Sequence, residues 1–368
     1  MKRREFLSKA SVAAAGAAAA TTLAKPAIAQ GNPEIKWRLT SSFPKSLDTL
    51  WGGAEHFAKR VADLTDNKFQ IQIFAAGEIV PGLQAADAVT AGTVEMAQTA
   101  SYYYWGKDPT FGIGSVMPFG LNTRGQTAWW YHGGGEKLMN DFYAKYKFYA
   151  IPAANTGAQM GGFFRTEIKT VADLKGLKFR IGGFGGKVIS KVGVVPTSIA
   201  GGDIYPALEK GAIDGAEWVG PYDDEKLGFH KIAKFYYYPG WWEANSMGHM
   251  FINLDKWNSL PKAYQTALHT AGTDTMTWVL AKYDVGNPPA LKRMLAQGVQ
   301  LKSFSEEVLD ACLIAANETY AEMSAENADF KKIWEHMKAF RAEQFLWQQL
   351  TEYTMDSYMM IQQRKQKL

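Results

Sequence analysis

The chain has 368 residues, which is enough for two ordinary domains with hydrophobic cores of their own. Residues 1–29 hold five of its 40 basic side chains and one of its 36 acidic ones, so the remainder carries 35 of each and no net formal charge. This balance argues against a nucleic-acid-binding protein. Cys312 is the only cysteine, so no internal disulfide forms, and its apolar neighbours favour a buried small side chain over a nucleophile.

The first residues have the pattern of an export signal. Lys2-Arg3-Arg4 begins a paired-arginine segment of the kind that the twin-arginine (Tat) route recognises, and an alanine-rich run covers Ser11 to Ala20. Ala27-Ile28-Ala29 matches a cleavage site, so we predict a Tat-type signal peptide over residues 1–29 and a mature start at Gln30. No later apolar run in the sequence is long enough to span a bilayer. These features predict a periplasmic protein.

The first half of the mature chain alternates strand and helix patterns. Apolar and polar residues alternate over Ile35–Leu39 and Phe69–Ile73, and apolar residues recur at helical spacing from Leu47 to Leu64. A strand–helix–strand unit of this kind predicts a parallel sheet. The pattern continues with a helix over Pro81–Ala91, a strand near Val94–Thr99, a helical segment over Thr123–Tyr146 that breaks at glycines 133–135, and a strand over Phe148–Ala154.

The same pattern restarts after Asn155 and predicts a second α/β domain. Ser246–Asn253 has the pattern of a strand that returns to the first domain, and two such crossings form a hinge. Between the crossings we expect strands over Met160–Phe164, up to Arg180 and over Ala216–Val219, with helices over Gly186–Val192 and after Asp203.

From Leu260 the chain is mainly helical. We expect helices over Lys262–Tyr283, Pro288–Ala296 and Glu306–Ala325. The last segment, from about Phe330 to Gln363, is roughly twice as long as a usual helix or more. Because one globular surface does not satisfy its apolar residues, we expect it to pack across both domains or against a second protomer.

Two polar residues of the second domain lie among apolar neighbours. Arg180 ends an apolar strand, where a paired structural arginine and a clamp for a substrate carboxylate fit the sequence equally well. Glu217 precedes Trp218 in a segment that suggests burial, and burying an unpaired carboxylate is unfavourable. Something must therefore neutralise Glu217.

Enzyme motifs are incomplete in this sequence. Tyr131–Gly135 resembles an esterase oxyanion loop, but the G-x-S-x-G motif that should accompany it is missing. Gly182–Lys187 lacks the spacing of a phosphate-binding loop, and the six histidines have no zinc-site spacing. Asp223-Asp224-Glu225 is explained most simply as the acidic first turn of a helix rather than as a calcium cluster. An esterase or metal-dependent lyase is therefore the disfavoured alternative.

Several long motifs resemble the extracytoplasmic solute-binding subunit of tripartite ATP-independent periplasmic (TRAP) transporters. The family markers are Val171–Arg180, Gly201–Gly215 and Glu78, and the resemblance spans the mature chain. Within the family, the chain is most similar to the subgroup that binds 2-oxo acids. The runs that carry this likeness are Tyr102–Phe111, Asn155–Gly162 and Glu217–Phe229.

The resemblance implies an α/β fold of the two-domain periplasmic binding protein type, with a hinge and a long C-terminal helix. Domain I is expected to comprise residues 30–155 plus 246–285, and domain II residues 156–245 plus 286–329. Residues 330–368 form the long C-terminal helix, which matches a subgroup with helix-swapped dimers. This match favours a homodimer.

The resemblance also implies the site residues. Arg180 pairs with the substrate carboxylate, and the substrate site further includes Gln159, Asn155, Tyr103 and Trp218. A metal ion, sodium with calcium as the alternative, bridges the substrate to Gln159, Glu217, the Trp218 carbonyl oxygen and Glu243. Aromatic walls at Tyr102–Trp105 and Trp241–Trp242 are expected to exclude longer acids.

The leading hypothesis is a non-enzymatic receptor that delivers a small 2-oxo monocarboxylate such as pyruvate to the TRAP membrane permease subunits. Closure around the ligand needs only differential affinity for the closed state. Two alternatives stay open. One is a receptor for 2-hydroxy acids such as lactate, bound as a calcium salt, and the other is the same fold working with a signalling partner.

Overall fold

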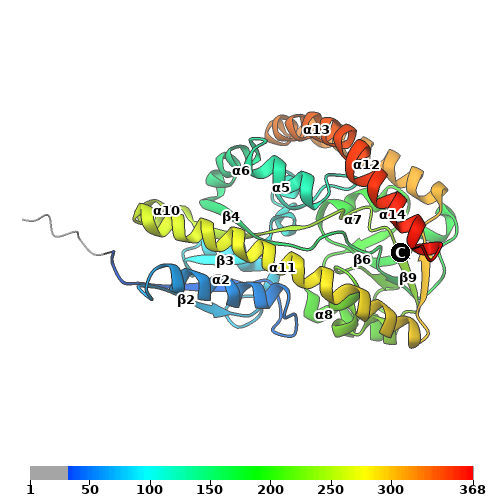
Figure 1. The fold of residues 1–368 in the computed structure, drawn as a ribbon, viewed down its shortest axis with the longest axis horizontal. Helices are drawn as coiled ribbons and strands as arrows, with labels where there is room; N and C mark the ends of the chain where they lie inside the picture. The colour runs from blue at the N-terminus through cyan, green and yellow to red at the C-terminus, as the bar shows by residue number, and fades with distance from the viewer. Residues whose placement is uncertain (1–31, 368) are drawn as a thin grey trace, which may run out of the picture. The chain divides into compact units, whose positions relative to one another are not determined.

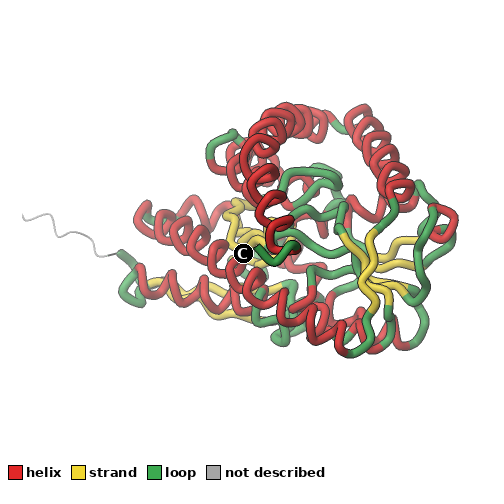
Figure 2. Tube along the Cα trace, turned by 45° about the vertical axis from the view of Figure 1, so that its right-hand side comes forward, coloured by secondary structure: helices red, strands yellow, loops and turns green. Residues whose placement is uncertain are grey.

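The structure is a computed structural model that describes residues 32–367. The predicted signal peptide lies outside this range. From Ile35 onward the chain forms one compact unit, and its described strands fall into two sheets (Figure 1). The sheets form two separate groups of strands with helices around them (Figure 2).

The first sheet is mixed and contains the parallel unit that the sequence predicts. Its order is β2-β1-β3-β10-β4, in which β1 is parallel to β2 and β3, whereas β10 is antiparallel to β3 and β4. Helix α2 (Leu50–Leu64) joins β1 to β2 and buries Ala54, Phe57 and Val61, which confirms its predicted apolar face. The strands are β1 (Ile35–Ser41), β2 (Phe69–Phe74), β3 (Met96–Ala100), β4 (Phe148–Asn155) and β10 (Met247–Asn253).

The second sheet has the order β11-β9-β5-β8-β6-β7. Stacked rings fill its core, since Phe163 lies on Tyr236 and Phe164 on Phe179, with ring centroids 4.0 and 4.7 Å apart. Its strands are β5 (Phe163–Phe164), β6 (Lys178–Arg180), β7 (Val195–Thr197), β8 (Gly215–Ala216), β9 (Phe235–Tyr238) and β11 (Gln300–Ser303). Below, the first lobe means the first sheet with α2 and the loops and turns that adjoin them, and the second lobe means the second sheet with helices α8 (Gly201–Glu209) and α9 (Pro221–Leu227) and the loops that adjoin them.

Four of the remaining shorter helices, α3, α5, α6 and α7, overlap predicted ones, whereas α4 and α10 were not predicted. The predicted glycine break is confirmed, because Gly134 has a positive φ of 89° and separates α5 from α6. These helices are α3 (Ala85–Thr90), α4 (Phe111–Ser115), α5 (Thr123–Tyr131), α6 (Gly135–Tyr143), α7 (Gly183–Ser190) and α10 (Leu254–Ser259), with short 3₁₀ turns that include Ser101–Tyr104.

Two neighbouring strands carry the chain between the lobes. β4 ends at Asn155 and β10 begins at Met247, and these two residues pair with each other. The Thr156 N–H donates to the Ser246 carbonyl at 3.1 Å, and the Ser246 N–H donates to Thr156 Oγ1 at 3.0 Å. The predicted crossings therefore lie side by side, as a hinge requires.

One long helix replaces two predicted ones. The prediction that Lys262–Tyr283 and Pro288–Ala296 are separate helices is wrong, because α11 (Lys262–Ala296) continues through Pro288 and Pro289. The prolines remove intrahelical donors, but packing against both lobes holds the helix. It contacts α2 and β4 of the first lobe and α9 of the second, where Asn287 Oδ1 accepts the Tyr222 N–H at 3.0 Å.

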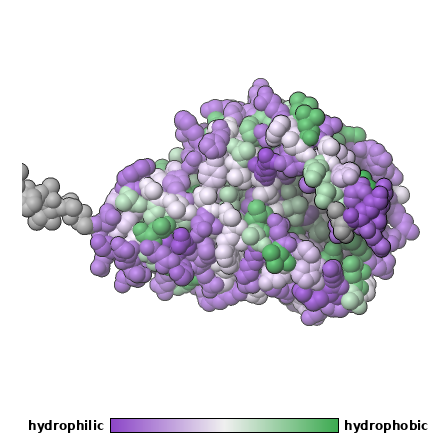
Figure 3. All heavy atoms as spheres, viewed as in Figure 1, coloured by the Kyte–Doolittle hydropathy of each residue, from purple (hydrophilic) through white to green (hydrophobic). Residues whose placement is uncertain are grey.

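The C-terminal segment is helical almost to its end. Helix α12 (Glu306–Glu326) packs against α13 (Ala328–Gln348), and a π-helical turn over Gln349–Tyr353 leads into α14 (Thr354–Arg364) (Figure 1). The first half of α13 is buried through Phe330, Ile333, Trp334 and Met337. Beyond it, large apolar side chains are exposed, and Figure 3 shows apolar groups among polar ones where α13 and α14 lie. They are Phe345, Leu346, Trp347, Leu350, Tyr353, Met355, Tyr358, Met360 and Ile361.

Candidate ligand-binding site

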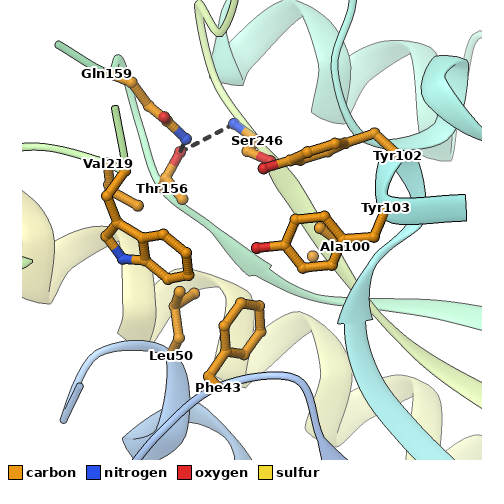
Figure 4. A pocket seen from close by; sticks show the side chains of 11 residues that line it. Phe43, Leu50, Ala100, Tyr102, Tyr103, Thr156, Gln159, Val219 and Ser246 are labelled. Atoms are coloured by element: carbon orange, nitrogen blue, oxygen red, sulfur yellow. Dashed lines mark hydrogen bonds between the residues drawn. The ribbon is translucent and has the colours of Figure 1, made fainter. Parts of the chain in front are cut away.

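A small cavity lies between the two lobes (Figure 4). Its walls are mainly apolar and aromatic, with a few polar groups, which is the composition of a site for a small organic ligand. The first lobe supplies most of the walls, the second supplies Gln159, Trp218 and Val219, and the hinge supplies Thr156 and Ser246. The first-lobe residues are Phe43, Leu50, Ala100, Tyr102, Tyr103 and Gly248.

The hinge fixes the orientation of the Gln159 amide. Gln159 Nε2 donates to Thr156 Oγ1 at 3.0 Å, and the same oxygen accepts the Ser246 N–H (Figure 4). With its amide nitrogen held this way, Gln159 leaves its Oε1 atom buried without a hydrogen-bond partner. A buried acceptor of this kind is unfavourable unless a ligand or an ion completes it.

Arg180 is fully buried and only partly hydrogen-bonded. Its Nε donates to the Ile199 carbonyl at 3.1 Å, and Nη1 donates to the Glu217 carbonyl at 2.8 Å and to Glu217 Oε1 at 2.5 Å. The guanidinium also lies 4.9 Å from the centre of the Trp218 ring. Nη2 has no partner, so the arginine is anchored on one side while an amino group stays free for an anion.

Glu217 and Glu243 are buried carboxyl groups whose hydrogen bonds and ion pairs do not satisfy all of their oxygens. Each has a buried Oε2 atom without a partner. Burial raises the pKa of Glu217 to about 7, although the Arg180 charge opposes the rise. Burial and the nearby Glu217 charge raise the pKa of Glu243 well above its usual range, against hydrogen bonds from Tyr102 and Ser246. Two such carboxyls do not both ionise readily without a cation.

The structure brings most of the predicted site residues together. Gln159, Tyr103 and Trp218 line the cavity. Arg180 and Glu217 adjoin it through Trp218. The Gln159 N–H donates to the Glu243 carbonyl at 3.3 Å, which places Glu243 next to the same group.

Asn155 lies elsewhere. It contributes to a larger cavity on another side of the hinge, together with Thr123 and Asp284. Its Nδ2 donates to Asn245 Oδ1 at 3.0 Å, and its Oδ1 accepts from Thr123 Oγ1 and from the Gly157 N–H. The side chain is therefore engaged in holding the hinge.

The expected aromatic walls are right in part. Tyr102 and Tyr103 line the cavity, but the Tyr104 hydroxyl accepts the Ala86 N–H in the core of the first lobe. The prediction that Trp241 and Trp242 form a wall is wrong. Trp241 stacks on Phe119 and Trp242 packs on Phe179 and Phe304, because large rings suit a core as well as a ligand site.

Sequence reasoning missed seven of the residues that line the cavity, among them Phe43, Leu50, Thr156 and Ser246. Phe43 and Leu50 belong to the segment before α2 and to its first turn, and Trp218 meets Phe43 edge-on with ring centroids 6.2 Å apart. Thr156 and Ser246 lie at the hinge. The signal for Thr156 was available, since it lies inside the Asn155–Gly162 run.

The residues present fit a cation with hard oxygen ligands. Gln159 Oε1, Glu217 Oε2 and Glu243 Oε2 are buried oxygens without partners, and such oxygens suit sodium or calcium. The part of the chain that the structure describes has no group of three or more His, Cys, Asp or Glu side chains that could hold a metal. A cation here would therefore depend on the glutamine amide and main-chain carbonyls in addition to the two glutamates.

Comparison with known proteins identifies the family. Residues 40–327 match the family described as bacterial extracellular solute-binding protein family 7, DctP. The chain belongs to this family. The DctP proteins are the solute-binding receptors of TRAP transporters and are not enzymes, which confirms the resemblance seen in the sequence.

Three similar proteins are informative for this DctP protein. The monocarboxylate 2-oxoacid-binding periplasmic protein of Nostoc sp. (strain PCC 7120) is 48% identical, with 97% of this chain and 99% of the relative covered. A TRAP transporter solute-binding protein from Bordetella bronchiseptica, solved as a mixed-occupancy dimer with copurified calcium and picolinate in one active site, is 46% identical. Its TM-score is 0.90, with coverage of 91% of this chain and 99% of that one.

A third relative, the TRAP periplasmic solute-binding protein from Pseudoalteromonas atlantica, was solved with bound sodium and pyruvate. It is 35% identical with a TM-score of 0.85, and 88% of this chain and 99% of that chain are covered. These likenesses confirm the α/β fold class, with two domains, a hinge and a long C-terminal helix. The family is periplasmic, and no helix among residues 32–367 is long and apolar enough to cross a membrane.

Proposed function

We propose that this protein captures a small 2-oxo monocarboxylate such as pyruvate in the periplasm, together with a cation, and delivers it to the TRAP membrane permease. The observation that carries the proposal is the group of unpartnered buried polar atoms at one place, namely the free Nη2 of Arg180 beside the free oxygens of Gln159, Glu217 and Glu243. The Nostoc relative, named as a 2-oxoacid-binding protein, and the pyruvate-bound Pseudoalteromonas structure support this choice of ligand.

The proposal gives each site residue a role. Arg180 donates from Nη2 to the substrate carboxylate, while its other nitrogens stay anchored. Tyr103 and Trp218 hold the substrate from the sides, and Asn155 acts from outside the cavity by fixing the hinge. The keto and carboxylate oxygens of a 2-oxo acid form a chelating pair. Together with Gln159, Glu217, Glu243 and the Trp218 carbonyl oxygen, they would hold the cation.

Charge balance separates the two candidate ions. With Arg180 charged and the ligand carboxylate and both glutamates ionised, the group has a net formal charge of about −2, which calcium neutralises. Sodium suits the site when Glu243, whose pKa burial and Glu217 raise, keeps its proton. Calcium binding should therefore release more protons than sodium binding.

The test is a titration of the ligand-stripped mature protein with pyruvate, followed by intrinsic tryptophan fluorescence, in sodium, in calcium and in neither ion. A saturable change that requires one ion supports the proposal and identifies the ion. A change without either ion would remove the cation from the proposal. A response to lactate in calcium with none to pyruvate would move the assignment to 2-hydroxy acids, and silence toward both acids would refute it.

The proposal extends to export and assembly. The protein uses the Tat route, consistent with the paired arginines of the predicted signal peptide, and the domains divide as residues 30–155 plus 246–285 and 156–245 plus 286–329. It forms a homodimer through residues 330–368, because large apolar side chains of α13 and α14 are exposed in the part of the single chain that the structure describes. A second subunit would cover them. A chain shortened after Trp334 should then sediment as a monomer, and a shortened chain that still sedimented as a dimer would refute this role.

A further inference from the structure

Three short segments meet beside the ligand cavity but do not line it. They are Asp48-Thr49, just before α2 in the first lobe, Tyr222 to Lys226 in α9 of the second lobe, and Lys282-Tyr283 in α11. Asp48 bonds to residues of the other two segments, and so does its neighbour Thr49 through Asp223. We call this set of contacts the interlobe latch.

The outer part of the latch centres on Asp48. This carboxylate pairs with Lys226 of the second lobe and with Lys282 at 2.8 Å, and it accepts the Tyr222 hydroxyl at 3.1 Å. Burial raises the pKa of Asp48, but hydrogen bonds from both lysines outweigh it and lower that pKa to about 2. The side chain is 48% exposed, so salt should weaken this part of the latch.

The inner part of the latch is buried from solvent. Thr49, Asp223 and Tyr283 are each 0% exposed. The Thr49 hydroxyl donates to Asp223 Oδ1 and the Tyr283 hydroxyl donates to Asp223 Oδ2, both at 2.7 Å. Separating the lobes would break the Thr49 bond, and in the closed state the loss of either hydroxyl would leave a buried carboxyl oxygen without that donor.

The latch is connected to the ligand site because α9, which carries Asp223, directly follows a segment of that site in the chain. Helix α9 begins at Pro221, directly after the segment that holds Glu217 and Trp218. The Val219 N–H donates to Asp224 Oδ1 at 3.2 Å, which ties this segment to the first turn of α9. The position of the site segment and the position of Asp223 are therefore set together.

We propose that Thr49 and Asp223 are positioning residues that hold the two lobes closed and so set how long the ligand stays bound. They touch neither ligand nor cation and act through the closure of the second lobe onto the first. A ligand leaves only after the lobes separate, so the latch adds to the barrier for release and leaves capture unchanged. The inference rests on the proposed function only for the identity of the ligand.

The test uses Thr49→Val, which removes the hydroxyl and keeps the shape of the side chain. Its matched control is Thr319→Val, which removes an equally buried hydroxyl that bonds only to Ala315 O within α12. We expect the dissociation rate of pyruvate, measured by stopped-flow fluorescence, to rise about tenfold in Thr49→Val. The association rate should change less than about twofold, and the control should match the parent protein.

A second pair of variants keeps the test decisive if Thr49→Val fails to fold. Tyr283→Phe removes the other donor to Asp223, and Tyr236→Phe removes the hydroxyl that donates to Asp224 at 2.7 Å entirely within the second lobe. Faster release in Tyr283→Phe but not in Tyr236→Phe supports the latch. Unchanged release in both latch variants, or equal acceleration in the controls, would overturn it.

A ligand-free measurement separates this inference from the proposed function. Spin labels at introduced cysteines replacing the exposed residues Glu55 in α2 and Lys210 beside α8 report the separation of the lobes, since the native Cys312 is fully buried. The latch predicts longer label distances in Thr49→Val than in the parent, and identical distances would overturn it. Failure of the parent to bind pyruvate would refute the ligand assignment but leave this readout intact.

Discussion

Replacing Arg180 with methionine is the sharpest test of the site. Methionine fills much of the same space without charge or donors, so it removes the anion-binding group and keeps the packing against Trp218. In the parent, the hydrogens of Nε and Nη1 are used by Ile199 and Glu217, and only Nη2 is free. The loss in ligand binding is therefore that of one amino group and not of the whole guanidinium.

The hydrogen bonds from Nη2 set the expected loss of affinity. A hydrogen bond to a charged group contributes about 1.5–3 kcal/mol, and Nη2 offers the ligand carboxylate one or two of them. Affinity for pyruvate should fall by at least about tenfold if one such bond is lost, and by roughly 100-fold to 10,000-fold if two are lost. The fold should persist, because burial raises the pKa of Glu217, and without the Arg180 charge that opposes this rise the carboxyl takes up a proton in place of its cationic partner.

Isothermal titration calorimetry with pyruvate at pH 6, with thermal unfolding of the same samples, measures both effects. Arg341→Met is the matched control, since Arg341 donates to the Phe119 carbonyl outside the cavity. A dissociation constant within about threefold of the parent in Arg180→Met would refute the carboxylate clamp. Equal loss of affinity in Arg341→Met would show that the effect is not specific to the site.

Three further predictions follow from single contacts. Thr156→Val should weaken pyruvate binding by about fivefold to tenfold, because the Gln159 amide loses its anchor, and Thr156→Ser should restore it in the same titration. Gly182→Ala should lower both the melting temperature and the affinity, because its Cβ would lie 2.4 Å from the Tyr102 ring; an unchanged melting curve would contradict this. Burial raises the pKa of Asp224 from 3.8 to about 8. Its contribution to stability is therefore complete below about pH 4 and is lost as pH rises through about 8. Urea unfolding at pH 5 and 9 should show a smaller loss of stability in Asp224→Asn than in the parent, and equal losses would exclude this carboxyl as the source.

The sequence predicted where the site residues lie in the chain better than it predicted which of them bond to each other. Arg180 was placed at a strand end and Glu217 in a buried segment, because apolar neighbours mark both positions. That these two side chains bond to each other depends on β6 pairing with β8, in register from Arg180 to Ala216. Strand order is set by contacts between distant segments, and local periodicity does not encode it.

Other failures have different physical causes. Trp241 and Trp242 could not be assigned to core or cavity, because an aromatic ring serves either place. The two prolines of α11 indicated a break, but packing against both lobes stabilises the helix through them. The side chain of Asn155 was placed in the site by likeness alone, and its actual hydrogen bonds depend on the neighbouring crossing strand.

Thr156 Oγ1 accepts from both Gln159 and the main chain of Ser246, so one oxygen links the ligand site to the backbone of the second crossing strand. The Ser246 amide hydrogen is therefore protected by a side chain whose position depends on Gln159. When the Gln159 Oε1 atom gains a partner, Thr156 becomes more firmly held and exchange of that amide with solvent should slow. A single backbone proton in the hinge thus reports, without any label, whether the site is filled.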